Sequence, residues 1–256
     1  VTLNGTIQNA SGGTWSNGLG IFSPNNNILT ATYTPSQTEI NNGQVMLILT
    51  STGNGNCLAV SDTMYIFYTP APTANAGSDI TICYNNPIVN LNGNVTVATG
   101  GIWQGGGGTF NPSATDLSTT YIPTPTELDN GSFSLTLTTT GNGSCIAVSD
   151  QINVNVIAAP IVDAGQNQTI CVDNLTVSLY GYISGPTNTG VWSSSGTGYF
   201  TPSANSLTAT YHASSQDSLN GQITLYLTST NNGLCNAEKD SMQINILPAG
   251  IANAGS

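Results

Sequence analysis

The chain has 256 residues and a formal net charge of −11 at pH 7, because one basic residue, Lys239, stands against twelve acidic ones. This balance excludes nucleic acid as a natural partner, since phosphate binding relies on Lys and Arg, and it argues against docking on an anionic membrane. No apolar run approaches the ~18 residues of a spanning helix, so membrane insertion is not expected.

Short segments of alternating apolar and polar residues recur along the chain. They occupy 45–49, 133–138, 152–156, 223–227 and 242–246. Period-two alternation predicts strands with one buried and one solvated face. Asn-Gly pairs at 42–43, 130–131 and 220–221, together with the Gly-rich segments TGNGNC, TGNGSC and TNNGLC, predict the turns between them. No stretch shows a sustained helical period, so the sequence predicts an all-β chain.

The chain repeats itself. Trp15, Trp103 and Trp192 lie 88 and 89 residues apart, and Cys57, Cys145 and Cys235 lie 88 and 90 apart. We expect a tandem array with a repeat at 1–70 that lacks its first strand, repeats at 71–158 and 159–248, and the start of a further repeat at 249–256, where the ANAGS of 74–78 recurs. About seven short strands around a Trp predict an immunoglobulin-like β-sandwich of 88–90 residues.

Aromatic residues recur at equal places in every repeat. A sandwich places such a Trp against the opposite sheet, so we expect these side chains in the core rather than on a ligand-binding shelf. They are Trp15, Trp103, Trp192, Tyr33, Tyr121 and Tyr211.

The cysteines indicate an oxidising, extracellular setting. The simplest pairing lies within each repeat, Cys83–Cys145 and Cys171–Cys235, with Cys57 paired to a cysteine upstream of Val1. The alternative pairs neighbouring repeats, Cys57–Cys83 and Cys145–Cys171. Connectivity cannot be read from sequence, so both remain open.

No catalytic constellation is visible, and we expect no enzyme. His212 is the single histidine, and Gly105–Gly108 lacks the Lys and helix of a phosphate loop. Zinc is not expected, and neither is any cofactor. Structural calcium needs six to eight oxygens, whereas the acidic residues come one or two at a time. The candidates are Glu39, Glu127, Asp217 and Asp129 near the Asn-Gly pairs, and Asp79 and Asp163 near the seams.

The segments ANAGSDITIC and DAGQNQTIC, with the G-x-W, T-x-Y and late G-x-C…D segments, resemble the PKD-like immunoglobulin-like repeats of bacterial surface proteins. The version with these cysteines resembles repeats of giant surface proteins of Bacteroidota, which the type IX system secretes. The resemblance covers all three repeats. It implies an extracellular or cell-surface location. For proteins of this lineage it also implies O-glycosylation at Asp-Ser/Thr-apolar motifs, here Thr63, Ser218 and Ser241.

Two functions follow as expectations. The first is a non-catalytic structural and adhesive repeat region, acting as a stalk or as a multi-chain filament for attachment, gliding or prey capture. Its partners would be neighbouring repeats of the same chain and copies of itself in a homo-oligomeric filament. The alternative is a set of carbohydrate-binding accessory repeats of a secreted polysaccharide-degrading enzyme, which would need a row of exposed aromatic residues.

Overall fold

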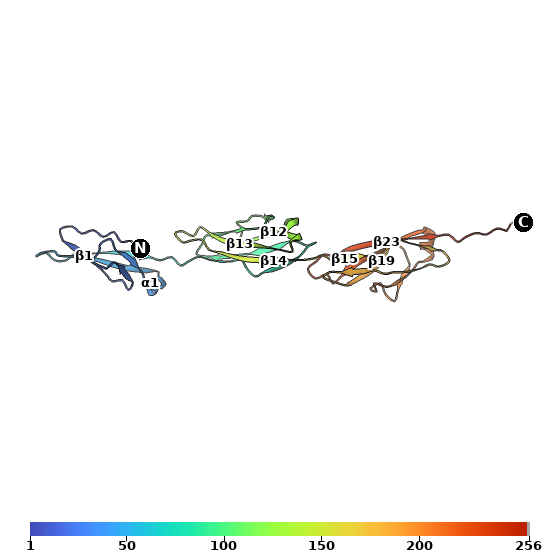
Figure 1. The fold of residues 1–256 in the computed structure, drawn as a ribbon, viewed down its shortest axis with the longest axis horizontal. Coiled ribbons are helices and arrows are strands. Elements are labelled where there is room, and N and C mark those ends of the chain that lie inside the picture. Colours follow the sequence, from blue (N-terminus) through green and yellow to red (C-terminus); the bar gives the residue numbers. More distant parts are fainter. Residues whose placement is uncertain (255–256) are drawn as a thin grey trace. The chain divides into compact units, whose positions relative to one another are not determined.

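The computed structural model describes residues 1–254, and these residues form an almost wholly β structure with three short helices (Figure 1). The first repeat contains β1 (Gly12–Ser16), β2 (Ile21–Ser23), β3 (Thr32–Thr34), α1 (Gln37–Asn41), β4 (Gln44–Thr52) and β5 (Ser61–Phe67).

The second repeat contains β6 (Thr73–Asn75), β7 (Ile80–Cys83), β8 (Val89–Asn92), β9 (Asn94–Thr96), β10 (Gly100–Gln104), β11 (Thr109–Asn111), β12 (Ser118–Ile122), α2 (Pro125–Asp129), β13 (Ser132–Thr140) and β14 (Ser149–Ile157). The third contains β15 (Ile161–Asp163), β16 (Gln168–Cys171), β17 (Thr176–Ser178), β18 (Tyr182–Ser184), β19 (Thr189–Ser194), β20 (Tyr199–Thr201), β21 (Thr210–His212), α3 (Ser215–Asn220), β22 (Gln222–Thr230) and β23 (Lys239–Leu247).

The second and third repeats are β-sandwiches of the expected class. In the second, the sheet β10-β13-β14-β7 faces the sheet β11-β12-β8, and in the third the sheet β19-β22-β23-β16 faces the sheet β17-β21-β20. The opening strands β7 and β16 run parallel to the last strand of their own repeat, while the other pairs are antiparallel. The first repeat has only three strands, β1-β4-β5, in the corresponding sheet.

The alternating strands and the recurring aromatics build the cores. In the second repeat, Leu135 and Leu137 on β13 are fully buried, and Trp103 on β10 lies directly opposite Leu137. Tyr121 reaches the same cluster from the other sheet. The corresponding Trp and Tyr side chains of the other two repeats are buried in their own clusters. Burial of these alternating faces supplies the main driving force for folding.

The three helices are the feature that the periodicity did not predict. Each is only five or six residues long and begins at a capping box, in which the N-cap hydroxyl accepts the N3 amide hydrogen and the N3 carboxylate accepts the N-cap amide hydrogen. The Gly of each Asn-Gly pair follows with a positive φ, 74° at Gly43, which suits a residue without a Cβ. The helix is therefore set by local caps and not by an apolar stripe.

The capping carboxylate is also the centre of a buried hydrogen-bond network. In the first repeat, the Tyr33 hydroxyl donates to Glu39 Oε1 at 2.7 Å, and the Leu19 amide donates to the same oxygen at 2.8 Å. Burial, the largest influence on Glu39, acts to raise its pKa, but the bonds from Tyr33, Ser36 and Leu19 outweigh it and lower the pKa to about 2. Burial, followed by the bond to Glu39, raises the pKa of Tyr33 to about 12.

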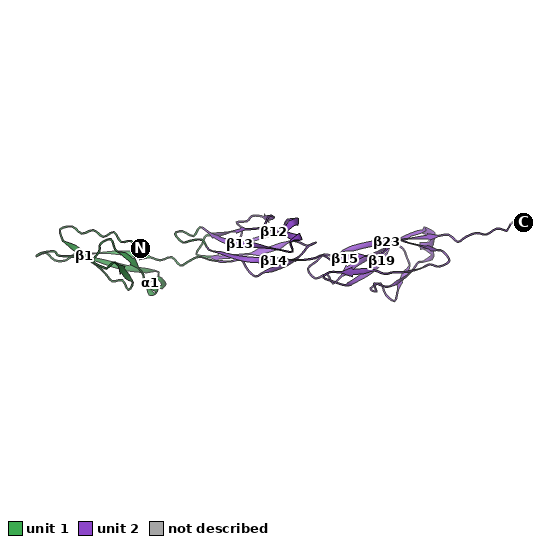
Figure 2. Cartoon of the chain, in the orientation of Figure 1, with its two compact units in different colours: residues 1–73, 96–99, 141–147 green, residues 74–95, 100–140, 148–256 purple. Residues whose placement is uncertain are grey.

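Residues 1–254 form two compact units, coloured separately in Figure 2. One holds 1–73 with 96–99 and 141–147, and the other holds most of the second and third repeats. None of the helices among the described residues is long and apolar enough to span a membrane. The predicted start of a further repeat, 249–256, ends on Gly255 and Ser256, which lie outside the described residues.

The Glu39 network predicts a loss of stability in acid. Because its pKa in the folded chain is below that of an unfolded Glu, its contribution is complete above about pH 4.5 and disappears as the pH falls towards about 2. Chemical denaturation of Glu39→Gln at several pH values should show lower stability at pH 7 but a smaller further loss between pH 4.5 and 2. The exposed Asp116→Asn is the control, and equal acid slopes for Glu39→Gln and the parent chain would contradict the prediction.

Candidate functional site: the junction between the second and third repeats

A disulfide joins the second repeat to the third. Cys83 is the last residue of β7, where it is completely buried, and Cys235 lies in the turn between β22 and β23. Their Cα atoms are 5.0 Å apart, which is within the normal range for a disulfide. Both sulfurs also lie beside the carbonyl oxygen of Ala158, at 3.8 and 3.6 Å, in the segment that connects the two repeats.

Hydrogen bonds surround this disulfide on its exposed side. Asn85 Nδ2 donates to Glu238 Oε1 at 2.6 Å and to the Asn236 carbonyl at 3.1 Å. Asn236 donates back from its amide to Asn85 Oδ1 at 3.0 Å and from Nδ2 to the Asn85 carbonyl at 2.6 Å. Asn86 Nδ2 donates to the Leu234 carbonyl at 3.0 Å. The junction therefore combines a covalent bond with reciprocal amide pairing that fixes its register.

The observed pairing corrects the one expected from sequence. Neither Cys83–Cys145 nor Cys171–Cys235 forms, and neither do the alternative pairs Cys57–Cys83 and Cys145–Cys171. The reason is strand direction. Cys83 lies opposite Ile157 at the end of β14, whereas Cys145 precedes the start of β14. A nine-residue strand separates the two positions by about 27 Å.

Because β7 runs parallel to β14, Cys83 at the end of β7 lies where the chain passes into the third repeat. Its disulfide partner is therefore Cys235, the late cysteine of the third repeat. Cys145 occupies the position in the second repeat that Cys235 has in the third, and its sulfur lies 3.8 Å from the carbonyl oxygen of Pro70. Pro70 is the counterpart of Ala158, 88 residues earlier. Cys57, Cys145 and Cys171 are unpaired among the described residues.

The acidic residues considered for calcium do not come together. Glu39, Glu127 and Asp217 are buried as caps in three separate repeats. Asp79 accepts the Asn153 amide at 2.8 Å, and Asp163 accepts the Gly165 amide at 2.8 Å. Within residues 1–254, no three His, Cys, Asp or Glu side chains gather in a way that could hold a metal ion. The sequence predicts no cofactor, with structural calcium only as the weaker alternative, and this stays a prediction.

The other solitary groups have internal partners. His212 Nε2 lies 2.8 Å from Thr201 Oγ1, and the ring stacks on Tyr199 with centroids 4.7 Å apart. Lys239 Nζ lies 3.7 Å above the ring of Tyr226. In the Gly-rich loop, the Gly107 amide donates to Glu127 and the Gly108 amide donates to the Tyr121 hydroxyl. This loop therefore serves the buried carboxylate of its own repeat.

The three expected glycosylation sites differ in their surroundings. Thr63 and Ser241 are exposed on β5 and β23, whereas Ser218 is half-buried in α3 beside the buried Asp217. A modifying enzyme that recognises the Asp would reach it more easily at Asp62 than at Asp217. Modification at these residues stays a prediction.

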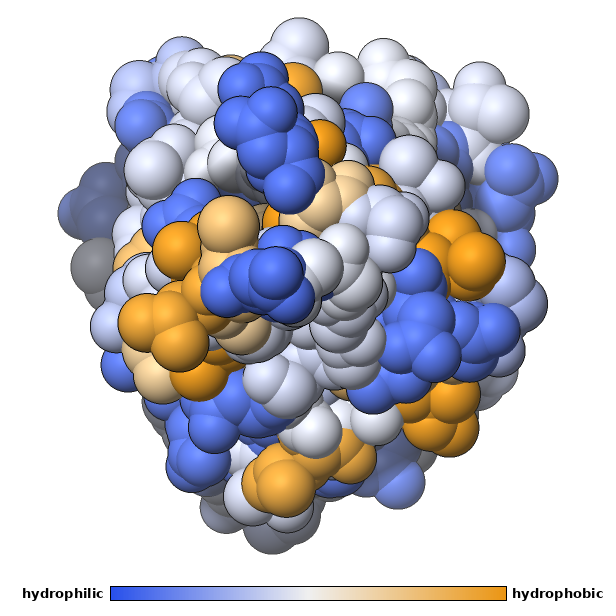
Figure 3. All heavy atoms as spheres, turned by 90° about the vertical axis from the view of Figure 1, so that its left-hand side faces the viewer, coloured by the Kyte–Doolittle hydropathy of each residue, from blue (hydrophilic) through white to orange (hydrophobic). Residues whose placement is uncertain are grey.

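Among the residues that the structure describes, the exposed aromatic side chains do not recur from repeat to repeat. On the face drawn in Figure 3, apolar side chains form separate patches among polar ones. Exposed aromatics do occur, but they lie at different places in different repeats: Tyr65, Phe67, Tyr84, Tyr180, Tyr182 and Tyr199.

Comparison with known proteins found only remote similarity, and only among solved structures. No family model matches the chain, and no curated protein sequence matches it. Among solved structures, the mouse protocadherin-24 EC1-3 structure is 11% identical, with 96% of this chain and 93% of that chain covered at a TM-score of 0.42. Mouse cadherin-23 EC22-24 is 10% identical, with coverage of 96% and 90% and a TM-score of 0.39. Sidekick-1 immunoglobulin domains 1–5 are 14% identical, with coverage of 93% and 52% and a TM-score of 0.34.

The sequence did not single out Asn85, Asn236 or Glu238. The position of Asn236 is held by Ile146 in the second repeat and Leu58 in the first, so no recurrence marks it. The disulfide itself was recognisable only as two cysteines of unknown connectivity.

From this junction we predict one pair of disulfide-linked peptides. Non-reducing proteolysis and mass spectrometry of the purified chain should recover peptides of residues 83 and 235 joined together, with the link lost on reduction. Recovery of Cys83 joined to Cys145, or of Cys171 joined to Cys235, would contradict the structure.

Proposed function

We propose that this chain is a non-catalytic structural and adhesive repeat region of a long extracellular bacterial protein, in which disulfides fasten each repeat to the next. The Cys83–Cys235 bond carries the proposal, because it links two repeats and not two parts of one. Disulfides persist in oxidising, extracellular compartments, and the sparse charge of the surface fits such a setting.

The position of the disulfide suits a protein that transmits tension. A pull applied to the two ends of the chain would pass along β7, through the sulfur–sulfur bond and into β23. The 152-residue interval between the cysteines, which holds most of the second and third sandwiches, would then be protected from extension. Such a linkage lets an array bear force without depending on the hydrogen bonds of every sheet.

The pattern extends to the other cysteines in a longer array. An early cysteine of one repeat would join the late cysteine of the following repeat, as Cys83 joins Cys235. By this rule Cys145 would pair with the early cysteine of the first repeat, which lies upstream of Val1, and Cys57 with the early cysteine of the repeat before that. Cys171 would pair with the late cysteine of a fourth repeat. Cys145 already lies against the Pro70 carbonyl in the way that Cys235 lies against Ala158.

The finer parts of the proposal rest on the sequence resemblance to PKD-like repeats. They are type IX secretion, a bacterium of the Bacteroidota, and a role as a stalk or as a multi-chain filament in attachment, gliding or prey capture. Labelling native surface material with an antibody against this chain distinguishes the two forms in electron microscopy. Single beaded threads indicate a stalk, and thick regular fibres labelled along their length indicate a filament.

Single-molecule force spectroscopy of the full chain tests the fastening. Reduction should increase the total contour length by roughly 500 Å, because 152 residues separate the cysteines and an extended chain spans about 3.3 Å per residue. Cys83→Ser with Cys235→Ser should give the longer value without reductant, and Cys171→Ser should keep the shorter one. An unchanged contour length on reduction would refute the tension path.

A further inference from the structure

The third repeat carries four aromatic side chains on one part of its surface. Tyr180, Tyr182 and Tyr199 are 75%, 59% and 61% exposed, and the ring of Tyr199 stacks on the ring of His212. We call these four side chains the aromatic face. Keeping several large rings in water is unfavourable, so exposed rings that gather on one side of a domain mark a binding surface.

The strand register places two of the four rings on the outer side of the sheet β17-β21-β20. Thr176 on β17 and Tyr199 on β20 both lie opposite His212 on β21. The next pair along these strands, Val177 and Tyr211, is buried in the core. Because successive side chains of a strand point to opposite faces of a sheet, Tyr199 and His212 lie on the outer face.

Tyr180 and Tyr182 extend the same face beyond the end of β17. The Leu179 amide donates to the Ala209 carbonyl at 2.9 Å, which continues the register of β17 with β21. Leu179 and Ile183 are buried in the core, so the tyrosines that alternate with them point outward. All four aromatic side chains therefore project from one side of the third repeat.

The aromatic face is long and has hydroxyl groups along it. Tyr180 is four residues from Thr176, the neighbour of His212, and four residues of an extended strand span about 13 Å. The outward positions between the two pairs of rings are Ser178, Thr208 and Thr210. The face therefore offers rings at two points and hydrogen-bonding groups between them, which suits an extended ligand.

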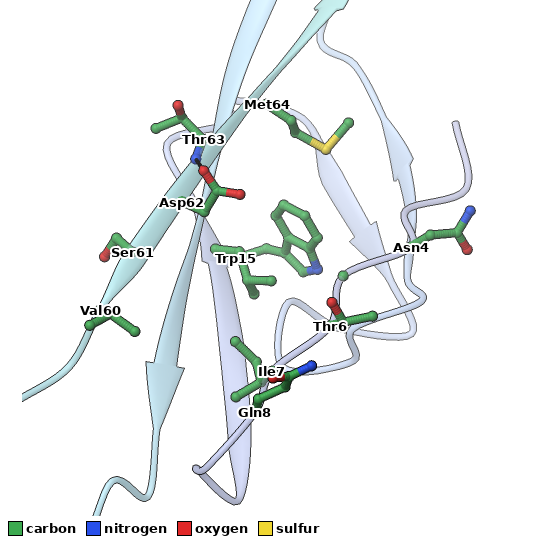
Figure 4. A pocket seen from close by; sticks show the side chains of 12 residues that line it. Asn4, Thr6, Ile7, Gln8, Trp15, Val60, Ser61, Asp62, Thr63 and Met64 are labelled. Carbon is green, nitrogen blue, oxygen red and sulfur yellow. Dashed lines mark hydrogen bonds between the residues drawn. The ribbon is translucent and has the colours of Figure 1, made fainter. Parts of the chain in front are cut away.

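The fold itself does not require these rings. The equivalent positions hold smaller or aliphatic side chains, which are Asn92, Asn94, Thr109 and Ile122 in the second repeat and Asn4, Thr6, Ile21 and Thr34 in the first. Figure 4 shows Asn4 and Thr6 as short polar side chains. A lateral contact made by every repeat of an array would use recurring positions, so rings that are confined to one repeat indicate a local ligand.

Tyr199 is held in position before any ligand binds. Its ring centroid is 4.7 Å from that of His212, with 8° between the two planes. His212 Nε2 in turn lies 2.8 Å from Thr201 Oγ1. A ring that is supported in this way and is still largely exposed loses little conformational entropy when a ligand packs on it.

The charge of the chain restricts what this face can bind. The chain has a net charge of −11 and one basic residue, Lys239, whose Nζ lies over the ring of Tyr226. Asp163 lies opposite Tyr182 and adds a carboxylate at the border of the aromatic face. An anionic ligand would therefore be repelled, whereas an uncharged one would not.

An uncharged polysaccharide fits these features. The C–H groups of a sugar ring pack on the face of an aromatic ring, and its hydroxyl groups exchange hydrogen bonds with Ser, Thr and Tyr hydroxyls. We propose that the aromatic face of the third repeat is a binding site for an uncharged polysaccharide. This inference names the ligand class of the adhesive role and rests on that part of the proposed function, but it does not depend on the Cys83–Cys235 bond.

Affinity electrophoresis of the full chain tests the site. Native gels contain hydroxyethylcellulose, xylan, galactomannan or yeast mannan, with alginate as the anionic control. At least one uncharged polysaccharide should retard the chain. Tyr180→Asn and Tyr199→Thr, which introduce the residues that the second repeat has at these positions, should each weaken that binding by roughly 10-fold. Tyr65→Ala, at an exposed tyrosine of the first repeat, is the matched control and should bind like the parent chain.

Several outcomes would overturn the proposal. They are migration unaffected by all four uncharged polysaccharides, equal retardation of the parent chain and both variants, and retardation by alginate as strong as by the others. Sedimentation equilibrium of the parent chain and Tyr180→Asn identifies the rival occupant. A mass that falls in the variant while polysaccharide binding is unchanged would make the face a contact between copies. The force measurement on reduction is independent of these results, so loss of the binding site and loss of the disulfide fastening are told apart.

Discussion

Each complete repeat depends on the strand that opens it. β7 and β16 lie parallel beside the last strand of their own repeats, and the alanine that precedes each of them fills the core near the central Trp. Cys83 pairs with Ile157, the last residue of β14, so it lies where the chain passes into the next repeat. The parallel packing of the opening strand thus completes the core and also places a cysteine at the junction.

This constraint connects the junction with the cores of the repeats. At the junction, the opening strand carries the disulfide, and the reciprocal bonds between Asn85 and Asn236 hold the neighbouring turns in register. In the second and third repeats the opening strand thus has two roles, because it closes the core and it ends beside the next repeat.

The buried carboxylates show a structural role for a strongly repeated acidic residue. Glu39, Glu127 and Asp217 recur near turns, one in each repeat. Their oxygens accept hydrogen bonds from a tyrosine hydroxyl and from backbone amides, so their charge stabilises a short helix and the loop beside it. The S/T-x-x-E/D pattern of the capping box was present in the sequence and would have predicted these helices, because capping is a local interaction.

The sequence by itself determined the all-β class, the repeat of about ninety residues and the burial pattern of the long strands, because side-chain periodicity and turn chemistry act over a few residues. Only the tertiary structure decided which cysteines meet. Their meeting depends on the direction in which the opening strand lies against the last one, and that choice joins residues more than seventy positions apart. Asn85 and Asn236 lie still farther apart in the chain, and no local pattern connects them.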